Sequence, residues 1–257
     1  MPNGDGVQAC RHALRGLGER GTHAGAVLDY YLQKQNDKDN EARLKVLRQA
    51  AAASLRAEKI YAMAFRRWRA APAIRRTVAV DGRLIVGLGA QTALETGITL
   101  HHTYGTPLIP GTALKGLASH FCAEVWGADE PRYKEKGAFH HEIFGDQDDA
   151  GYIAFHDAWI VPGALRNGSG LVRDVMTPHH GDYYMKGAPP TDFDDPNPVT
   201  FLSVTGQFEL MVSCGNVDQD ANRKKWAELA MNLLLAALQD WGVGGKTNAG
   251  YGRMHAV

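Results

Sequence analysis

Hydrophobic residues in the first 76 positions recur every three to four residues, which is the spacing of one helix face. A short run covers residues 26–32, and a longer one covers residues 44–68, where arginines and lysines stand between the apolar positions. Pro72 ends the longer run, because a proline disfavours helical geometry in the residue before it. The pattern predicts a helical N-terminal extension, residues 1–76, whose basic amphipathic helix packs on its own domain. RNA or a membrane surface is the alternative partner of that helix.

Beyond residue 77 the spacing changes to the alternation of a β-strand and returns twice to helical spacing. Strand patterns cover residues 84–88, 152–157 and 200–213, helix patterns cover 112–125 and 226–241, and a short strand follows the second helix. The order β-α-β-β-α-β predicts an α+β fold: a ferredoxin-like (RRM-like) domain, residues 77–257, with an antiparallel sheet and both helices on one face. The stretch between the second and third strands is too long for a simple hairpin, so we expect long inserted loops with a role in function or interaction.

Composition narrows the class of protein. With 257 residues, 44% of them hydrophobic, the chain can bury one large core or two small ones. No apolar run approaches the roughly 20 residues that span a bilayer, and the N-terminus lacks a signal-peptide pattern, so we expect a cytoplasmic protein without a membrane partner. The three cysteines lack CxxC spacing, which indicates neither a disulfide framework nor a zinc site.

Charge is distributed unevenly although the formal net charge is zero. Residues 1–76 contain 15 Lys/Arg and 7 Asp/Glu, whereas residues 77–257 contain 13 and 21. The basic extension suits RNA and the acidic domain suits a basic neighbouring subunit, with solvated helix faces as the alternative for either.

A glycine-rich basic loop, residues 242–253, follows the last helix. It is not a nucleotide-binding P-loop, because that motif requires a preceding strand, a following helix and a glycine at the position of Asp240. Glycines let backbone amides approach a ligand closely, and lysine and arginine add donors suited to phosphate. We therefore expect a polynucleotide backbone as the ligand, with a helix C-cap and turn as the alternative. The candidate RNA-binding residues of this loop are Gly244, Gly245, Lys246, Thr247, Asn248 and Arg253.

A second candidate anion site lies at the start of the helix pattern near residue 112. Thr112 stands near the helix cap, where free amides and the helix dipole favour an anion, and Lys115 adds charge one turn later. In a ferredoxin-like domain this helix start and the glycine-rich loop could border one groove. Ordinary helix capping is the alternative.

Three histidine pairs stand in the domain: His101-His102, His140-His141 and His179-His180. Neighbouring residues of an extended segment point to opposite sides, and no HxH or HxxxH spacing occurs, so we expect no metal site and no cofactor. An imidazole could act as general base on a ribose 2′-hydroxyl, but no second acid or phosphate site is indicated beside it. Stacking and hydrogen bonding to unpaired bases is the preferred interpretation for His101, His102, His179 and His180, with Tyr104, Tyr183 and Tyr184 nearby.

Several of these stretches, in this order, resemble the RAMP superfamily of CRISPR proteins and, within it, the sixth-subunit family of the type III-B (Cmr) effector complex. The resemblance covers nearly the whole chain. It depends on residues 23–32, 95–105, 107–116, 174–180 and 196–202 and on the terminal glycine-rich loop.

This resemblance implies a ferredoxin-like, RNA-binding structural subunit without a catalytic centre of its own. It implies a position near the 3′ part of the guide RNA, while a different subunit cuts the target RNA. The implied protein partners are the repeated backbone RAMP subunit, a small helical subunit and the other terminal RAMP subunit. Lys115, Lys246 and Arg253 would contact phosphates, with Thr112, Thr247 and Asn248 as neutral donors. A metal-independent endoribonuclease that processes guide precursor and a protein-only scaffold are the alternatives.

Overall fold

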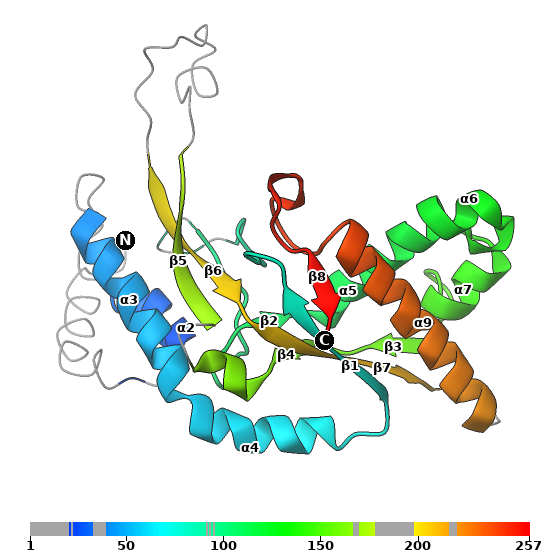
Figure 1. Ribbon diagram of the computed structural model, residues 1–257, viewed down its shortest axis with the longest axis horizontal. Helices are drawn as coiled ribbons and strands as arrows, with labels where there is room; N and C mark the ends of the chain where they lie inside the picture. The colour runs from blue at the N-terminus through cyan, green and yellow to red at the C-terminus, as the bar shows by residue number, and fades with distance from the viewer. Residues whose placement is uncertain are drawn as a thin grey trace, which may run out of the picture.

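The structure is a computed structural model (Figure 1). It describes residues 21, 23–32, 40–90, 92, 94, 96–166, 170–177, 198–215 and 220–257. Among these residues no helix is long and apolar enough to cross a bilayer.

The described residues of the predicted N-terminal extension are largely helical up to Arg69. They form α2 (Ala24–Tyr30), α3 (Asn40–Arg56) and α4 (Glu58–Arg69). The single long helix expected from the periodicity is interrupted at Ala57, between α3 and α4, and Figure 1 shows the two helices running in different directions. The buried face of α4 consists of Tyr61, Ala64 and Phe65, and the Tyr61 hydroxyl donates to the carbonyl of Ile160 at 2.6 Å. The basic amphipathic helix therefore packs on its own chain.

The domain is built on an antiparallel sheet with strand order β2-β4-β7-β1-β8, and β3 also pairs with β7. Its strands are β1 (Ile74–Val80), β2 (Leu108–Ile109), β3 (Ile153–Phe155), β4 (Ala158–Ile160), β7 (Gln207–Cys214) and β8 (Met254–Ala256). The helices α5 (Gly111–Phe121) and α9 (Asp220–Asp240) pack against each other and on these strands. The prediction of an α+β fold with an antiparallel sheet is confirmed.

Different helices pack on the two faces of the sheet. Successive side chains of β7 point to opposite faces. Glu209 is buried and pairs with Arg69 of α4 at 2.8 Å, so α4 covers its face. The neighbouring Phe208 and Leu210 are fully buried on the other face, toward α9. Helices thus cover both faces of the sheet.

Two predicted strands differ from the structure. The first strand begins at Ile74, whereas residues 84–88 form no strand beyond one bridge between Leu84 and Val204. The carbonyls of this segment bind other loops instead: Ile85 accepts from the Gly245 amide and Val86 from the Thr99 amide. A glycine-rich loop and a turn therefore occupy the positions that a neighbouring strand would need.

The third predicted strand, residues 200–213, is divided at Gly206, where φ is +118°. Its first part, β6 (Val199–Thr205), leaves the main sheet and pairs with β5 (Gly170–Met176), which the sequence did not predict. Figure 1 shows this two-stranded ribbon, here called the β5–β6 ribbon, projecting from the domain. It joins the main sheet to the segment 178–197, which lies outside the described residues.

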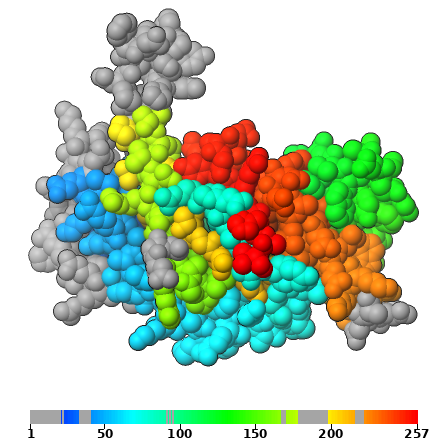
Figure 2. Space-filling view, viewed as in Figure 1, coloured from blue at the N-terminus to red at the C-terminus, as the bar shows by residue number. Residues whose placement is uncertain are grey.

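The first domain helix also ends in an unexpected way. At Cys122 the α-helical hydrogen-bond pattern changes to a π-helical turn, Cys122–Trp126. The short helices α6 (Gly127–Asp129) and α7 (Ala138–Phe144) follow it and form a helical outgrowth at one end of the molecule (Figure 1). This outgrowth lies at the far end from α3 and the β5–β6 ribbon, as the space-filling view also shows (Figure 2).

Candidate nucleic-acid interface

The glycine-rich loop is held against the segment that follows β1. The Gly245 amide donates to the Ile85 carbonyl and the Gly252 amide to the Arg83 carbonyl, both at 2.8 Å. Gly244 has φ of +92°, and a Cβ atom there would lie 2.1 Å from the Ile85 oxygen. Close backbone packing therefore requires a glycine at position 244. The amides of Gly245 and Gly252 bind protein carbonyls, so neither of these two amides is free for a ligand.

The side chains at the loop tip point outward. Lys246 and Asn248 are exposed, Thr247 is half-buried and Arg253 is exposed at the end of the loop. Lys246 adopts a left-handed backbone with φ of 59°, at the start of the 3-10 turn Thr247–Ala249. A lysine in this conformation is uncommon, and here it places the ammonium group on the bend of the loop.

A side-chain network that the sequence did not predict joins this loop to the β5–β6 ribbon. The Tyr251 hydroxyl donates to Asp174 Oδ2 at 3.0 Å, and Arg83 Nε lies 4.0 Å from the same oxygen. Burial, and then the hydrogen bond to Asp174, raise the pKa of Tyr251. The loop, the segment after β1 and the ribbon therefore form one surface, and Figure 1 shows the loop and the ribbon on the same side of the sheet. We call it the loop–ribbon surface.

The two histidines at 101 and 102 have opposite environments. The His101 ring lies edge-on to Trp159 with centroids 4.6 Å apart, and burial lowers the His101 pKa. His102 is exposed. Its carbonyl lies 2.6 Å from His23 Nε2, and His23 Nδ1 accepts from the Ala26 amide, so His23 Nε2 carries the proton and donates. Both histidines were predicted to contact unpaired bases, but the half-buried His101 ring packs against Trp159, so of the two only His102 is exposed.

Tyr104, expected to stack on RNA bases, packs inside the protein instead. Its ring lies 5.8 Å from Tyr61, edge-on, and 4.7 Å from the His101 ring. Trp159 and Trp68 stack at 5.0 Å with an interplanar angle of 7° in the same cluster. These rings attach α4 to the sheet, so their aromatic faces are already occupied.

The start of α5 differs from the predicted anion site. The Gly111 amide donates to the Asp157 carboxylate at 2.7 Å, so an internal anion already occupies the helix N-terminus. Thr112 and Lys115 are exposed. The ring contacts between α5 and the beginning of the glycine-rich loop involve His120 and Trp241, 5.0 Å apart, at the other end of the helix from Thr112. The described contacts therefore do not bring Thr112 and Lys115 to the loop.

The remaining predicted site residues, His179, His180, Tyr183 and Tyr184, lie outside the described residues. The last described pair of the β5–β6 ribbon, Met176 with Val199, flanks them in sequence. Within the described part of the chain, no group of three or more His, Cys, Asp or Glu side chains could hold a metal ion.

Comparison with known proteins supports the resemblance to the RAMP superfamily. Residues 77–255 match the family model of the RAMP superfamily. The CRISPR system Cmr subunit Cmr6 of Pyrococcus furiosus (strain ATCC 43587 / DSM 3638 / JCM 8422 / Vc1) is 31% identical over 226 residues, a match that covers 68% of this chain and 65% of that relative. The chain therefore spans just under two thirds of the relative's length.

Two solved structures are similar. The crystal structure of Cmr6 from Pyrococcus furiosus is 30% identical, with a TM-score of 0.46 over 72% of this chain and 98% of that one. A chain in the cryo-EM structure of the type III-B Cmr-beta bound to cognate target RNA is 16% identical, with a TM-score of 0.61 over 98% of this chain and 89% of that one. The second shares its fold with this chain.

Proposed function

The chain belongs to the RAMP superfamily, and from this premise we propose that it is a non-catalytic, RNA-binding structural subunit of a type III-B CRISPR ribonucleoprotein. In this role it holds guide RNA toward its 3′ end, together with target RNA, while another subunit cuts the target. Its protein partners are the repeated backbone RAMP subunit, the small helical subunit and the other terminal RAMP subunit.

The loop–ribbon surface is the observation that carries this proposal. The Tyr251–Asp174 hydrogen bond fixes the glycine-rich loop to the ribbon, which gives a ligand two elements at a constant spacing. Exposed Lys246 and Arg253 on the loop and exposed Arg173 on the ribbon supply positive charge. Cations on rigid elements bind a phosphate backbone independently of its sequence, as holding a variable guide requires.

The arrangement of the sheet favours RNA contact through loops and not through the sheet face. We infer a ferredoxin-like domain from the order β1, α5, β4, β7, α9, β8 and the spatial order β4-β7-β1-β8. RNA-recognition domains of this shape stack bases on an open sheet face. Here α4 and the ring cluster around Trp159 cover that face. RNA therefore meets the loop and the ribbon at the border of the sheet.

The outer face of α4 suits a protein partner. Ile60 and Met63, at helical spacing, are 57% and 55% exposed, which is unusual for large apolar side chains side by side. Exposed cations surround them: Arg56, Lys59, Arg66 and Arg67. Methionine and arginine are enriched in protein interfaces, and the charges favour a neighbouring subunit with an acidic rim.

The proposal is tested in the assembled particle. We expect the double variant Lys246→Ala, Arg253→Ala to retain less guide RNA than wild type and to show a salt dependence of RNA binding reduced by roughly one to two units of slope. Lys224→Ala, Lys225→Ala on α9 is the matched control, because both lysines are exposed. Equal loss of RNA in both double variants would mean that total charge, and not the loop–ribbon surface, governs binding.

The endoribonuclease alternative is tested in the same preparation. Incubation of the chain with guide precursor in the presence of EDTA should leave the RNA uncut. Cleavage that His102→Ala removes would instead identify a catalytic histidine and replace this proposal.

A further inference from the structure

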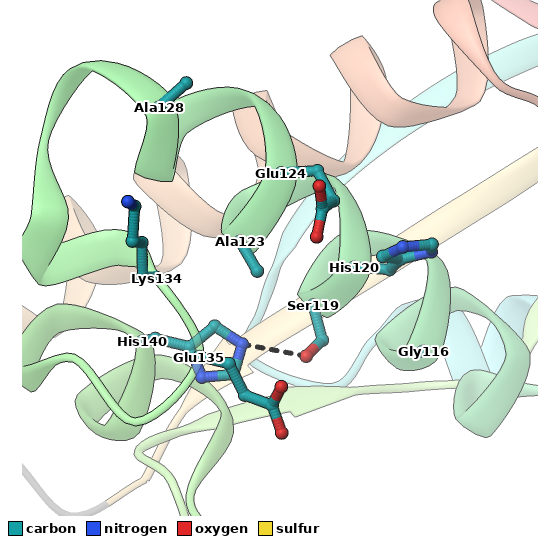
Figure 3. A pocket seen from close by; sticks show the side chains of 9 residues that line it. All are labelled: Gly116, Ser119, His120, Ala123, Glu124, Ala128, Lys134, Glu135 and His140. Atoms are coloured by element: carbon teal, nitrogen blue, oxygen red, sulfur yellow. Dashed lines mark hydrogen bonds between the residues drawn. The ribbon is translucent and has the colours of Figure 1, made fainter.

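A cavity that the loop–ribbon surface does not use lies between α5 and the helical outgrowth that follows it (Figure 3). Its volume is about 850 Å³, within the range of small-molecule sites. The polar side chains that line it are Ser119, His120, Glu124, Lys134, Glu135 and His140.

Two features of the backbone keep this cavity open. Gly116, Ala123 and Ala128 form parts of its wall, and a Cβ atom at Gly116 would meet nothing within 4 Å. The π-helical turn Cys122–Trp126 carries Ala123 and Glu124 to the cavity. Such turns are rare and occur frequently at functional sites, so the widened helix indicates that this wall has a role beyond packing.

The polar groups are arranged as complementary donors and acceptors. His140 is 7% exposed, and its Nε2 lies 2.9 Å from Ser119 Oγ. Figure 3 shows the Glu124 and Glu135 carboxylates on either side of this pair, one above it and one below it, with Lys134 on the other wall below Ala128. Burial lowers the pKa of His140, so its imidazole is neutral near pH 7. The wall that carries this pair thus offers two acceptors, and the wall with Lys134 offers a cation.

We propose that this cavity binds one nucleotide whose base carries an exocyclic amino group: adenine, cytosine or guanine. Carboxylates accept hydrogen bonds from such amino groups. The Lys134 ammonium pairs with the phosphate. Uracil lacks an exocyclic amino group and would direct carbonyl oxygens at Glu124 and Glu135, so the cavity discriminates against it.

One wall of the cavity contacts the residue that precedes the glycine-rich loop. The His120 ring, part of the cavity wall, lies 5.0 Å from the ring of Trp241, which directly precedes Gly242. An unpaired nucleotide of an RNA held on the loop is therefore one source of the ligand, and a free nucleotide is the other. The first source rests on the proposed function; the base preference is the same for both.

Binding of AMP, CMP and UMP to the full chain, measured by calorimetry, tests the cavity directly. We expect AMP and CMP to bind at least about tenfold more tightly than UMP. Gly116→Phe should abolish binding by filling the cavity, whereas Gly116→Ala, the matched control, should retain it. Glu135→Gln keeps the size of the side chain and should reduce the preference over UMP, while Glu228→Gln on α9 should not. Equal affinity for all three nucleotides, or undiminished AMP binding by a folded Gly116→Phe variant, would overturn the proposal.

Cross-linking of 6-thioguanosine-labelled RNA, whose base keeps an exocyclic amino group, distinguishes the sources in the assembled particle. Cross-links to the cavity that Gly116→Phe removes, with guide retention unchanged, identify an RNA nucleotide; AMP binding without such cross-links identifies a free one. Loss of guide in the Lys246→Ala, Arg253→Ala variant is a separate result, because neither residue lines the cavity. The two proposals can therefore fail independently.

Discussion

Gly244→Ala is expected to destabilise the chain strongly. Alanine substitutions at other glycines of the same glycine-rich loop serve as controls. The new methyl group would lie 2.1 Å from the Ile85 carbonyl oxygen, and the backbone there has φ of +92°. Left-handed geometry costs an alanine about 1–2 kcal/mol. Displacement of the Ile85 carbonyl also breaks its hydrogen bond from Gly245, which contributes about 1 kcal/mol. The free energy of unfolding should fall by about 2–3 kcal/mol, before any repulsion that remains after relaxation.

Two neighbouring glycines separate these contributions. Gly250 has φ of +86° with no atom within 4 Å of an added Cβ, so Gly250→Ala should cost only the conformational term, about 1–2 kcal/mol. At Gly245, φ is not in the left-handed range and the nearest atom lies at 3.9 Å, so Gly245→Ala should be close to neutral. Thermal unfolding should show Gly244→Ala about 4–12 °C below wild type, at roughly 2–4 °C per kcal/mol for a chain of this size.

Hydrogen exchange at the Gly245 amide gives the local measure of the same change. Protection of this amide should fall in Gly244→Ala and persist in Gly250→Ala. If Gly244→Ala and Gly250→Ala are equally stable, the close packing of the loop on the segment after β1 contributes nothing, and the reasoning is wrong.

Three further predictions follow from other parts of the structure. Arg69→Met should lower the unfolding free energy by about 1–3 kcal/mol in chemical denaturation, because the Glu209 side chain is 3% exposed and, among the described side chains, would keep only Thr77 as a partner. Arg66→Met, on the outer face of α4, should be neutral. The free energy of unfolding should be greatest above pH 6.5 and fall as the pH falls. Burial lowers the pKa of His101, His140 and His156 in the folded state, so unfolding takes up protons. Melting temperatures measured from pH 7.5 to 5.5 should therefore fall less steeply in His140→Gln than in wild type. The double variant Ile60→Glu, Met63→Glu should leave the melting temperature of the isolated chain nearly unchanged but reduce its incorporation into the particle. Val125→Glu, which changes another exposed apolar residue, should not affect incorporation.

The helices were the most predictable part of the fold. Periodicity located α2, α3, α4, α5 and α9, because each has an apolar stripe that the sequence displays directly. The break at Ala57 was missed, since the residues on either side continue the same spacing. Strands were harder to predict, because their extent depends on pairing partners distant in sequence. Gly206 illustrates this limit: the alternation continues past it, but its positive φ sends β6 and β7 to different sheets.

The sequence predicted which residue types form the candidate site, but it did not predict the contacts that join them. The glycines of the terminal loop identified a special backbone, and Lys246 and Arg253 within it are exposed. The hydrogen bond between Tyr251 and Asp174 joins residues 77 positions apart, and no spacing rule indicates it. Asp157 at the start of α5 was missed for the same reason, since a carboxylate from another element replaced the expected ligand.

The central claim, that the loop–ribbon surface holds RNA, is tested most directly by placing a photo-crosslinking amino acid at position 246 in the assembled, guide-loaded particle. A second particle carries it at position 224, which is also an exposed lysine but lies on α9. The account predicts RNA cross-links from position 246 and few or none from position 224. Cross-links from position 246 to protein alone, in a particle that contains guide RNA, would contradict it.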